Sequence, residues 1–375
     1  MGQTKEKKII ICSNYAWTIY NFRMPLIKRL KLEGYEVIIL TQFDGYEKLI
    51  KLNVDRIEPL FISRKGINPF IDIFTVLDLI RYFIKFKPDI LLLFSIKPVI
   101  YGSIAAHLTK VKSIVTITGL GTVFISNNWL TKIVKILYKL ALKNCSIIFF
   151  QNKDDRNLFV NQSIARLKLC HLIPGSGIDL KIFSYKRPPK SSNTVFLLVA
   201  RMLADKGVEE FVNAARKIKS NYPKTRFQLL GPLGVENRTA ISIAKMNEWQ
   251  LEGCIEYLGE TDDVASYIEK SCCVVLPSYR EGTSRVLLEA AAIGRPLIAT
   301  NVPGCKEVIE NGVNGFLCMP RDYVSLSMCI EQMIKLSYDK RKYMGIMGRR
   351  KVENEFDKDI VCNLYIQAIK NCAQN

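Results

Sequence analysis

The sequence predicts an α/β protein of two domains, each with a parallel sheet flanked by helices. The chain has 375 residues, above the usual ~100–200 residues of one domain. Short apolar runs alternate with amphipathic stretches in both halves, a pattern typical of repeated βα units. A polar, proline-containing segment at 185–193 (YKRPPKSSN) interrupts the alternation and reads as a linker.

The first half carries the alternation from its start. We expect strands at 8–13, 36–41, 90–94, 113–117, 146–151 and 168–173, and helices at 24–33, 70–86, 99–108 and 130–143. The stretch 174–177 (PGSG) then breaks the pattern.

The second half repeats the alternation after the linker. We expect strands at 195–200, 227–230, 255–258, 273–277 and 296–299, and helices at 208–218, 240–249, 284–293 and 326–336. A final helix has one apolar face, which includes Ile360, Leu364 and Ile369. We therefore predict two Rossmann-like domains facing a cleft, 1–187 and 188–354, with a C-terminal helix, 355–375, that returns to the first.

The charge of the chain favours an anionic partner. The formal net charge is +19, and residues 1–190 hold 30 basic against 13 acidic side chains. The aromatic residues are spread through apolar elements and no nucleic-acid-binding module is visible, which argues against nucleic acid. An anionic membrane surface fits better.

One helix is the candidate for contact with such a surface. Four lysines fall in one stripe of 130–143, and apolar residues occupy its other side; an ordinary solvated surface helix has the same pattern. The lysines are Lys132, Lys135, Lys139 and Lys143, and the apolar residues are Leu130, Ile133, Val134, Leu137, Leu140 and Ala141.

The remaining composition indicates a protein of a reducing compartment. Eleven cysteines, an odd number without paired C-x-x-C spacing, predict buried thiols and not a disulfide framework. The N-terminal segment is polar, and the longest apolar candidate, 89–108, contains Lys97 and Pro98, so we expect neither a signal peptide nor a spanning helix. The expected place is the cytoplasm.

Two loops at the ends of expected strands carry groups suited to a bound diphosphate. Arg201 follows the strand that ends at Ala200, and Lys206 opens the next helix, so two cations and free backbone N–H groups converge there. Glu281 follows the strand 273–277, and Glu289 comes eight positions later in a helix whose start, Gly282 to Ser284, exposes further N–H donors. Taken singly, each pair could equally be solvated surface residues.

As a set, these motifs resemble a known family. The Arg201/Lys206 loop, the Glu281 and Glu289 pair and the stretch IATNVPGCKEVIENGVNGFL (298–317) are similar to the retaining, nucleotide-sugar-dependent family 4 glycosyltransferases with the GT-B fold. Four stretches of the first half resemble the bacterial subgroup that extends polyprenyl-diphosphate-linked oligosaccharides, which includes N-acetylgalactosaminyltransferases. They are TIYNFRMPLI (18–27), SIKPVIYGSIAA (95–106), TGLGTVF (118–124) and PGSGIDLKIF (174–183).

The resemblance implies a role for each donor-site residue. Arg201 and Lys206 bind the donor diphosphate, Glu281 the donor sugar and Glu289 the ribose hydroxyls. The strand end at Leu258 and Gly259 holds the base, and the segment Gly282, Thr283, Ser284, Arg285 and Val286 caps the β-phosphate. Arg201, Lys206 and Glu281 are then the catalytic candidates, and the family uses neither a metal nor another cofactor.

The first half departs from the family pattern at one point. Many members place a histidine near the reacting sugar, where this chain reads Thr118, Gly119, Leu120 and Gly121. The two histidines, His107 and His171, fall in an expected helix and an expected strand, where a structural role is the better interpretation.

Other candidate groups lie in two first-half loops. Gly119 and Gly121 let backbone approach donor or acceptor, and Asn21 or Arg23, in the loop after the first strand, could meet an acceptor diphosphate. For Asn21 and Arg23, an ordinary role at the start of a helix fits equally well.

We therefore expect a retaining, metal-independent glycosyltransferase. It would move a sugar, N-acetylgalactosamine being slightly preferred, from a UDP-sugar to a polyprenyl-diphosphate-linked saccharide at the cytoplasmic membrane face. The alternatives are an NAD(P)-dependent oxidoreductase and a non-catalytic basic membrane scaffold. The Gly119–Gly121 loop lacks the third glycine and the acidic residue of the dinucleotide fingerprint, and the assembled donor-site residues argue against the scaffold.

Overall fold

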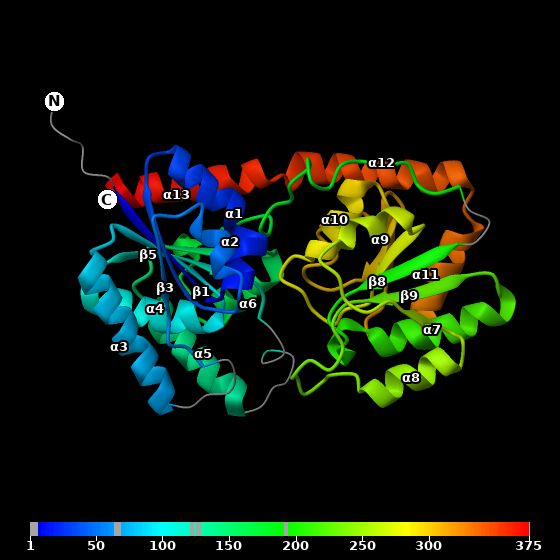
Figure 1. Cartoon of the computed structure of the whole chain (residues 1–375), viewed down its shortest axis with the longest axis horizontal. Coiled ribbons are helices and arrows are strands. Elements are labelled where there is room, and N and C mark those ends of the chain that lie inside the picture. The colour runs from blue at the N-terminus through cyan, green and yellow to red at the C-terminus, as the bar shows by residue number, and fades with distance from the viewer. Residues whose placement is uncertain (1–6, 64–68, 121–123, 125–128, 191–193, 375) are drawn as a thin grey trace. The chain divides into compact units, whose positions relative to one another are not determined.

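A computed structural model describes residues 7–63, 69–120, 124, 129–190 and 194–374. The chain forms two compact units, Met1–Gly177 with Lys358–Asn375, and Ile178–Asp357. The passage from the first unit to the second lies ten residues before the boundary expected at 187. Each unit is an α/β sandwich with a parallel sheet (Figure 1), so the predicted pair of Rossmann-like domains is confirmed.

The first unit contains a seven-stranded parallel sheet in the order β3-β2-β1-β4-β5-β6-β7. Its strands are β1 (Lys8–Tyr15), β2 (Glu36–Gln42), β3 (Arg56–Pro59), β4 (Ile90–Phe94), β5 (Lys112–Ile117), β6 (Ile147–Phe150) and β7 (Cys170–Leu172). Its helices are α1 (Ala16–Leu32), α2 (Glu47–Lys51), α3 (Pro69–Phe86), α4 (Ile96–Thr109), α5 (Trp129–Leu142), α6 (Lys153–Asn161) and α13 (Lys358–Gln374).

Alternating side chains of the central strands form two cores. In β1, Ile10 and Cys12 belong to the core under α3, α4 and α5, whereas Ile9 and Ile11 belong to the core under α1 and α13. Figure 1 shows these two helical layers on opposite sides of the sheet. The near-continuous apolar sequences of the strands follow from burial on both faces.

Helix α13 seals one face of the first sheet. Val361, Tyr365 and Ile369 are buried in the core that α13 shares with α1 and β1. The Tyr365 hydroxyl lies 2.7 Å from the Thr116 hydroxyl of β5 inside this core. The Lys112 ammonium donates to the carbonyl of Cys372, 2.8 Å away, so the last helix is fixed by polar contacts as well as by apolar burial.

The second unit contains a six-stranded parallel sheet in the order β10-β9-β8-β11-β12-β13. Its strands are β8 (Val195–Val199), β9 (Arg226–Leu230), β10 (Glu256–Tyr257), β11 (Cys273–Leu276), β12 (Leu297–Thr300) and β13 (Gly315–Cys318). Its α-helices are α7 (Val208–Asn221), α8 (Ile243–Leu251), α9 (Val264–Lys270), α10 (Arg285–Ile293), α11 (Tyr323–Lys335) and α12 (Tyr338–Glu355).

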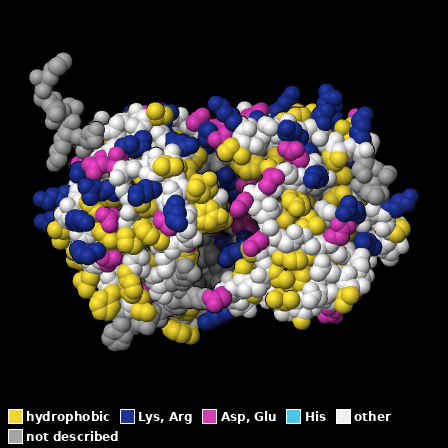
Figure 2. All heavy atoms as spheres, in the orientation of Figure 1, with side chains coloured by type: hydrophobic (Ala, Val, Ile, Leu, Met, Phe, Trp, Pro, Cys, Tyr) yellow, Lys and Arg dark blue, Asp and Glu magenta, His cyan; other side chains and the backbone are white. Residues whose placement is uncertain are grey.

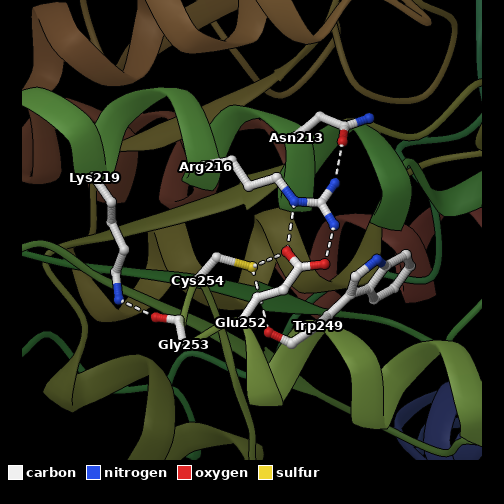
Figure 3. A network of polar contacts seen from close by, with 7 residues as sticks. All are labelled: Asn213, Arg216, Lys219, Trp249, Glu252, Gly253 and Cys254. Atoms are coloured by element: carbon white, nitrogen blue, oxygen red, sulfur yellow. Dashed lines mark hydrogen bonds and ion pairs between the residues drawn. The ribbon is translucent and has the colours of Figure 1, made fainter.

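Polar contacts fasten α7 to the turn after α8 (Figure 3). The guanidinium of Arg216 donates two parallel hydrogen bonds of 2.7 Å to the carboxylate of Glu252, and a third of 2.6 Å to Asn213. These hydrogen bonds from Arg216 lower the pKa of Glu252. Lys219, one turn further along α7, donates to the carbonyl of Gly253. The network therefore joins two helices that border neighbouring strands.

Removal of the Tyr365 hydroxyl tests how α13 is held. Tyr365→Phe leaves the buried hydroxyl of Thr116 without this partner, so we expect the free energy of unfolding to fall by about 1–3 kcal/mol. Tyr343→Phe removes an exposed hydroxyl and should change it by less than about 0.5 kcal/mol. Urea titration followed by circular dichroism measures both, and equal midpoints for the two variants would show that the buried contact is dispensable.

Candidate active site

The expected donor-site residues gather at one edge of the second sheet. Arg201 comes two residues after β8, Leu258 and Gly259 directly follow β10, and Glu281 lies in the loop after β11. Because β8, β9, β10 and β11 run parallel, their carboxyl ends meet at the same edge. The second unit alone thus brings the donor-site candidates to one side of one sheet.

The loop after β8 lies close against the loop after β11. Lys206 ends a short 3₁₀ turn, and Gly207 follows with φ of +74°. A Cβ on Gly207 would lie 2.1 Å from the carbonyl oxygen of Pro277, a distance that no side chain tolerates. Gly207 therefore sets how closely Lys206 approaches the β11 loop.

Lys206 and Glu281 form an ion pair across these two loops. The Nζ of Lys206 lies 2.5 Å from Oε1 of Glu281, with side chains 22% and 16% exposed. The N–H of Glu281 donates to the carbonyl of Pro303, 3.0 Å away in the loop after β12. The loops after β8, β11 and β12, which are neighbouring strands of the sheet, thus meet at one charged pair that solvent still reaches.

The N-terminus of α10 stands next to this pair. Ser284 is the N-cap residue, with its side chain accepting from the N–H of Leu287, and its own N–H donates to the carbonyl of Gly304. Within the helix, Nε of Arg285 lies 2.9 Å from Oε1 of Glu289. Burial raises the pKa of the Glu289 carboxyl, and Arg285 opposes the shift. The two glutamates therefore have different cationic partners, Lys206 and Arg285.

The ends of β9 and β10 complete the edge. The N–H of Leu258 donates to the carbonyl of Leu229, and the N–H of Gly231 donates to the carbonyl of Gly259 at 2.7 Å. Arg201 is exposed beside them, and in the described part of the chain its side chain has neither a hydrogen bond nor an ion pair. Its guanidinium is therefore free to bind an anion.

Sequence reasoning missed a tyrosine that supports the Glu281 loop. The Tyr279 hydroxyl donates to Oε1 of Glu210 in α7, 2.6 Å away, and its N–H donates to the carbonyl of Asp205. Burial and the neighbouring Glu210 raise the pKa of Tyr279, and the guanidinium of Arg321 lies 4.6 Å from the centre of its ring. No sequence spacing signals this contact, since Glu210 and Tyr279 are far apart in the chain.

The first-half candidates have local partners or lie outside the described residues. Arg23 is buried, with its guanidinium 4.0 Å from the centre of the Phe94 ring. The side-chain amide of Asn21 donates to the carbonyl of Trp17, 3.0 Å away. Gly119 has φ of +128°, and Gly121 lies outside the described residues.

The predicted settings of the histidines and cysteines are confirmed. His107 lies in α4 and His171 in β7, and all eleven cysteines are buried free thiols. Within the described ranges, no group of three or more His, Cys, Asp or Glu residues has the arrangement of a metal site. In those same ranges, no helix combines the length and the apolar composition needed to span a bilayer.

The expected division of α5 into a lysine side and an apolar side is wrong. Lys132, Lys139 and Lys143 are exposed as expected, but so are the apolar side chains of Ile133 and Leu140. Trp129 and Ile136 are also exposed, whereas Val134 and Ala141 are buried under the helix. The outer face of α5 is therefore both basic and apolar.

Two family profiles divide the chain in the same way as its fold. Residues 8–152 match the glycosyl transferase 4-like family, and residues 181–351 match glycosyl transferases group 1. With the two parallel-sheet units and the assembled edge of the second sheet, these matches define the class. The chain belongs to the GT-B glycosyltransferases of group 1, with a glycosyl transferase 4-like N-terminal domain.

Curated relatives extend over nearly the whole chain. The N,N'-diacetylbacillosaminyl-diphospho-undecaprenol alpha-1,3-N-acetylgalactosaminyltransferase of Campylobacter jejuni is 27% identical over 98% of this chain and 100% of its own length. The UDP-Gal:alpha-D-GlcNAc-diphosphoundecaprenol alpha-1,3-galactosyltransferase of Escherichia coli is 26% identical over 93% of this chain and 96% of its own.

Solved structures show the same fold. A glycosyltransferase from Rickettsia africae superposes with a TM-score of 0.80 at 19% identity, covering 99% of this chain and all of that one. Anabaena Alr3699/HepE in complex with UDP-glucose gives a TM-score of 0.78 at 18% identity, covering 97% and 99%. At these identities, the two structures show that the chain shares their fold.

Crowding at Gly304 should make this position intolerant of a side chain. Gly304 has φ of +83°, and a Cβ there would lie 2.5 Å from the carbonyl carbon and oxygen of Glu281. We expect Gly304→Ala to shift the Glu281 loop and to lower turnover by at least about tenfold, since misplacement by about 1 Å can cost more.

Gly312→Ala is the matched control. Gly312 has φ of +80° with no atom within 4 Å of an added Cβ, so it carries the same backbone strain without the clash. Melting temperature and turnover are measured for both variants. Equal turnover in the two would show that contact between the loops does not position Glu281.

Proposed function

We propose that this glycosyltransferase is retaining and transfers a sugar from a UDP-sugar to a saccharide linked to polyprenyl diphosphate. The observation that carries the proposal is the Lys206 and Glu281 ion pair, placed at the carboxyl edge of the second sheet beside the N-terminus of α10. A cation, a carboxylate and a helix N-terminus within one edge suit a ligand that combines a diphosphate with sugar hydroxyls.

The donor diphosphate is assigned to Arg201 and Lys206. As the glycosidic bond breaks, negative charge grows on the β-phosphate of the leaving UDP, and fixed donors aimed at it stabilise the transition state. Lys206 is held in place by Glu281 before any ligand binds, and Arg201, five residues earlier in the same loop after β8, is exposed. The N-terminus of α10, which begins at Arg285, adds the positive end of its helix dipole.

The remaining donor contacts follow from position along the edge. Glu281 can accept hydrogen bonds from the sugar hydroxyls while it holds Lys206. Glu289 lies one helical turn after Arg285, the first residue of α10, and is assigned to the ribose hydroxyls. Leu258 and Gly259, which follow β10, are assigned to the base.

The sugar is proposed to have the galacto configuration. The Campylobacter relative is named for N-acetylgalactosamine and the Escherichia coli relative for galactose. Both sugars carry an axial hydroxyl at C4, so a site derived from a common ancestor would recognise that group. We propose N-acetylgalactosamine as the donor sugar because the relative that uses it matches 98% of this chain.

Loss of Lys206 should affect chemistry far more than loss of another lysine. Lys206→Ala removes a diphosphate ligand and leaves Glu281 without its cation, so we expect about 2–4 kcal/mol less transition-state stabilisation, roughly 30- to 1,000-fold in kcat/KM. Lys245→Ala is the control, because Lys245 forms an ion pair of the same 2.5 Å length with Glu209, at 43% and 41% exposure. Similar losses in both variants would remove Lys206 from the donor site.

Catalysis is proposed to need no divalent metal, because cationic side chains and the helix N-terminus neutralise the leaving diphosphate. Chelation by EDTA should then leave the initial rate within about twofold of the untreated enzyme, since these fixed charges remain in place. A rate that disappears with EDTA and returns with Mg²⁺ would contradict this part of the proposal.

Attachment to an anionic membrane surface is proposed for the first unit, at the cytoplasmic face. The outer face of α5 carries lysines together with exposed Trp129, Ile136 and Leu140, and α3 adds exposed Phe74. Figure 2 shows hydrophobic side chains exposed over the region of α3. Such a face combines apolar insertion with attraction to anionic lipids.

Neutralising the three lysines of α5, together with Lys143 just after it, tests this attachment. Lys132, Lys135, Lys139 and Lys143 changed together to Gln should weaken binding to anionic liposomes, because each basic residue near the surface contributes about 1 kcal/mol. Transfer to a short soluble acceptor should be spared. Lys28, Lys48, Lys51 and Lys153, exposed elsewhere on the first unit, changed to Gln give a control of equal charge. Equal liposome binding by the two quadruple variants would place the membrane contact elsewhere.

A further inference from the structure

We propose that exposed and half-buried aromatic residues at the start of α1 and in the loop after β2 bind the saccharide of the acceptor. This aromatic platform consists of Trp17, Tyr20, Phe43 and Tyr46. The inference rests on the proposed function and adds to it the place where the sugar of the lipid-linked substrate lies.

The platform borders the topological switch point of the first sheet. β1 leads through α1 to β2 on one side, whereas β4 leads through α4 to β5 on the other. Ligands of open α/β sheets bind outside the carboxyl ends of the strands at such a point. The hydroxyls of Ser13, at the end of β1, and Ser95, after β4, lie 3.2 Å apart there, and Thr18 of α1 contacts Ser13 at 2.7 Å.

The aromatic rings come from two segments that are fastened together. Trp17 and Tyr20 are three residues apart in α1 and therefore share a helix face. The N–H of Trp17 donates to both carboxylate oxygens of Asp44, at 3.2 and 3.0 Å, which supplies the cap that Tyr15 does not provide. The ring of Tyr20 packs on that of Tyr46 with centres 5.5 Å apart. The rings are thus pre-positioned before a ligand binds.

These rings remain open to solvent although they are held in place. Trp17 is 44% exposed, Tyr20 38% and Phe43 40%. Among the described residues, the indole N–H of Trp17 and the hydroxyl of Tyr20 make no hydrogen bond. A pyranose ring presents an apolar C–H face and a rim of hydroxyls, so flat rings with free polar edges match both of its parts.

The charges around the platform favour a neutral saccharide over a lipid surface or a diphosphate. Asp44, in the loop after β2, accepts from the N–H of Trp17, and Glu47 accepts hydrogen bonds from the N–H groups of Asp44 and Gly45. Hydrogen bonds from backbone N–H groups lower the pKa of Glu47, which keeps it anionic. Two carboxylates repel phosphate and an anionic leaflet, but accept hydrogen bonds from sugar hydroxyls.

The experiment measures acceptor binding and transfer with a water-soluble probe, farnesyl-diphosphate-linked N-acetylglucosamine. We expect Trp17→Ala to raise KM for this probe about fivefold, and Trp17→Ala with Tyr20→Ala to raise it further, because each stacked ring contributes about 1 kcal/mol. Trp17→Phe, which keeps a ring, should recover most of the loss. Affinity for UDP should be unchanged, and Tyr343→Ala, an exposed tyrosine of the second unit, should behave as wild type.

The outcomes separate the platform from the proposed function. Unchanged KM in the double variant overturns the platform even if transfer by the wild type supports the function. If the wild type transfers no sugar, saturation-transfer NMR with the same probe decides: binding lost in Trp17→Ala supports a saccharide site, and no binding by the wild type overturns it. Reduced binding to anionic liposomes with unchanged KM would assign the rings to the membrane and also overturn the inference.

Discussion

The donor edge depends on one ion pair, Lys206 with Glu281, and on the close approach of the loops that carry it. An ion pair of partly exposed side chains adds little to stability. Its main effect is to fix where the Lys206 ammonium and the Glu281 carboxylate lie. Gly207 permits the β8 loop to contact Pro277, and Gly304 permits the β12 loop to contact the backbone of Glu281. A Cβ added at either glycine would therefore push apart two loops and displace the charged side chain that one of them carries.

The strands, and the places of Arg201, Lys206 and Glu281 just after them, could be predicted from sequence because each depends on local pattern. Buried parallel strands read as apolar runs, and Arg201, Lys206 and Glu281 follow such runs directly. Among the elements that were missed, which also include α9, β13 and α12, three lack this signal. β3 is an edge strand whose residues are exposed or half-buried, α2 has only five residues, and α6 is rich in polar residues (KDDRNLFVN).

The contacts between distant segments could not be predicted. The Tyr279 hydrogen bond to Glu210 and the capping of α1 by Asp44 join residues with no periodic relation in the sequence. The outer face of α5 was misassigned because helical periodicity shows which residues share a side, but not which side a neighbouring element covers. Ile133 and Leu140 fall outside the surface that the first unit buries. In the same way, the sequence predicted that Arg23 lies in a loop and could meet an anion. In the fold it is a buried residue of α1, with its guanidinium against the ring of Phe94.

The two units divide the proposed reaction between them. The second sheet presents cations and a helix N-terminus, which suit the leaving nucleotide, whereas the first presents aromatic rings and carboxylates at its switch point, which suit a saccharide. The most direct test is the anomeric configuration of the product formed from UDP-N-acetylgalactosamine and a prenyl-diphosphate-linked sugar, determined by NMR coupling constants. The account predicts an α-linked product, with the configuration of the donor retained. A β-linked product, or no transfer from any UDP-sugar, would contradict it.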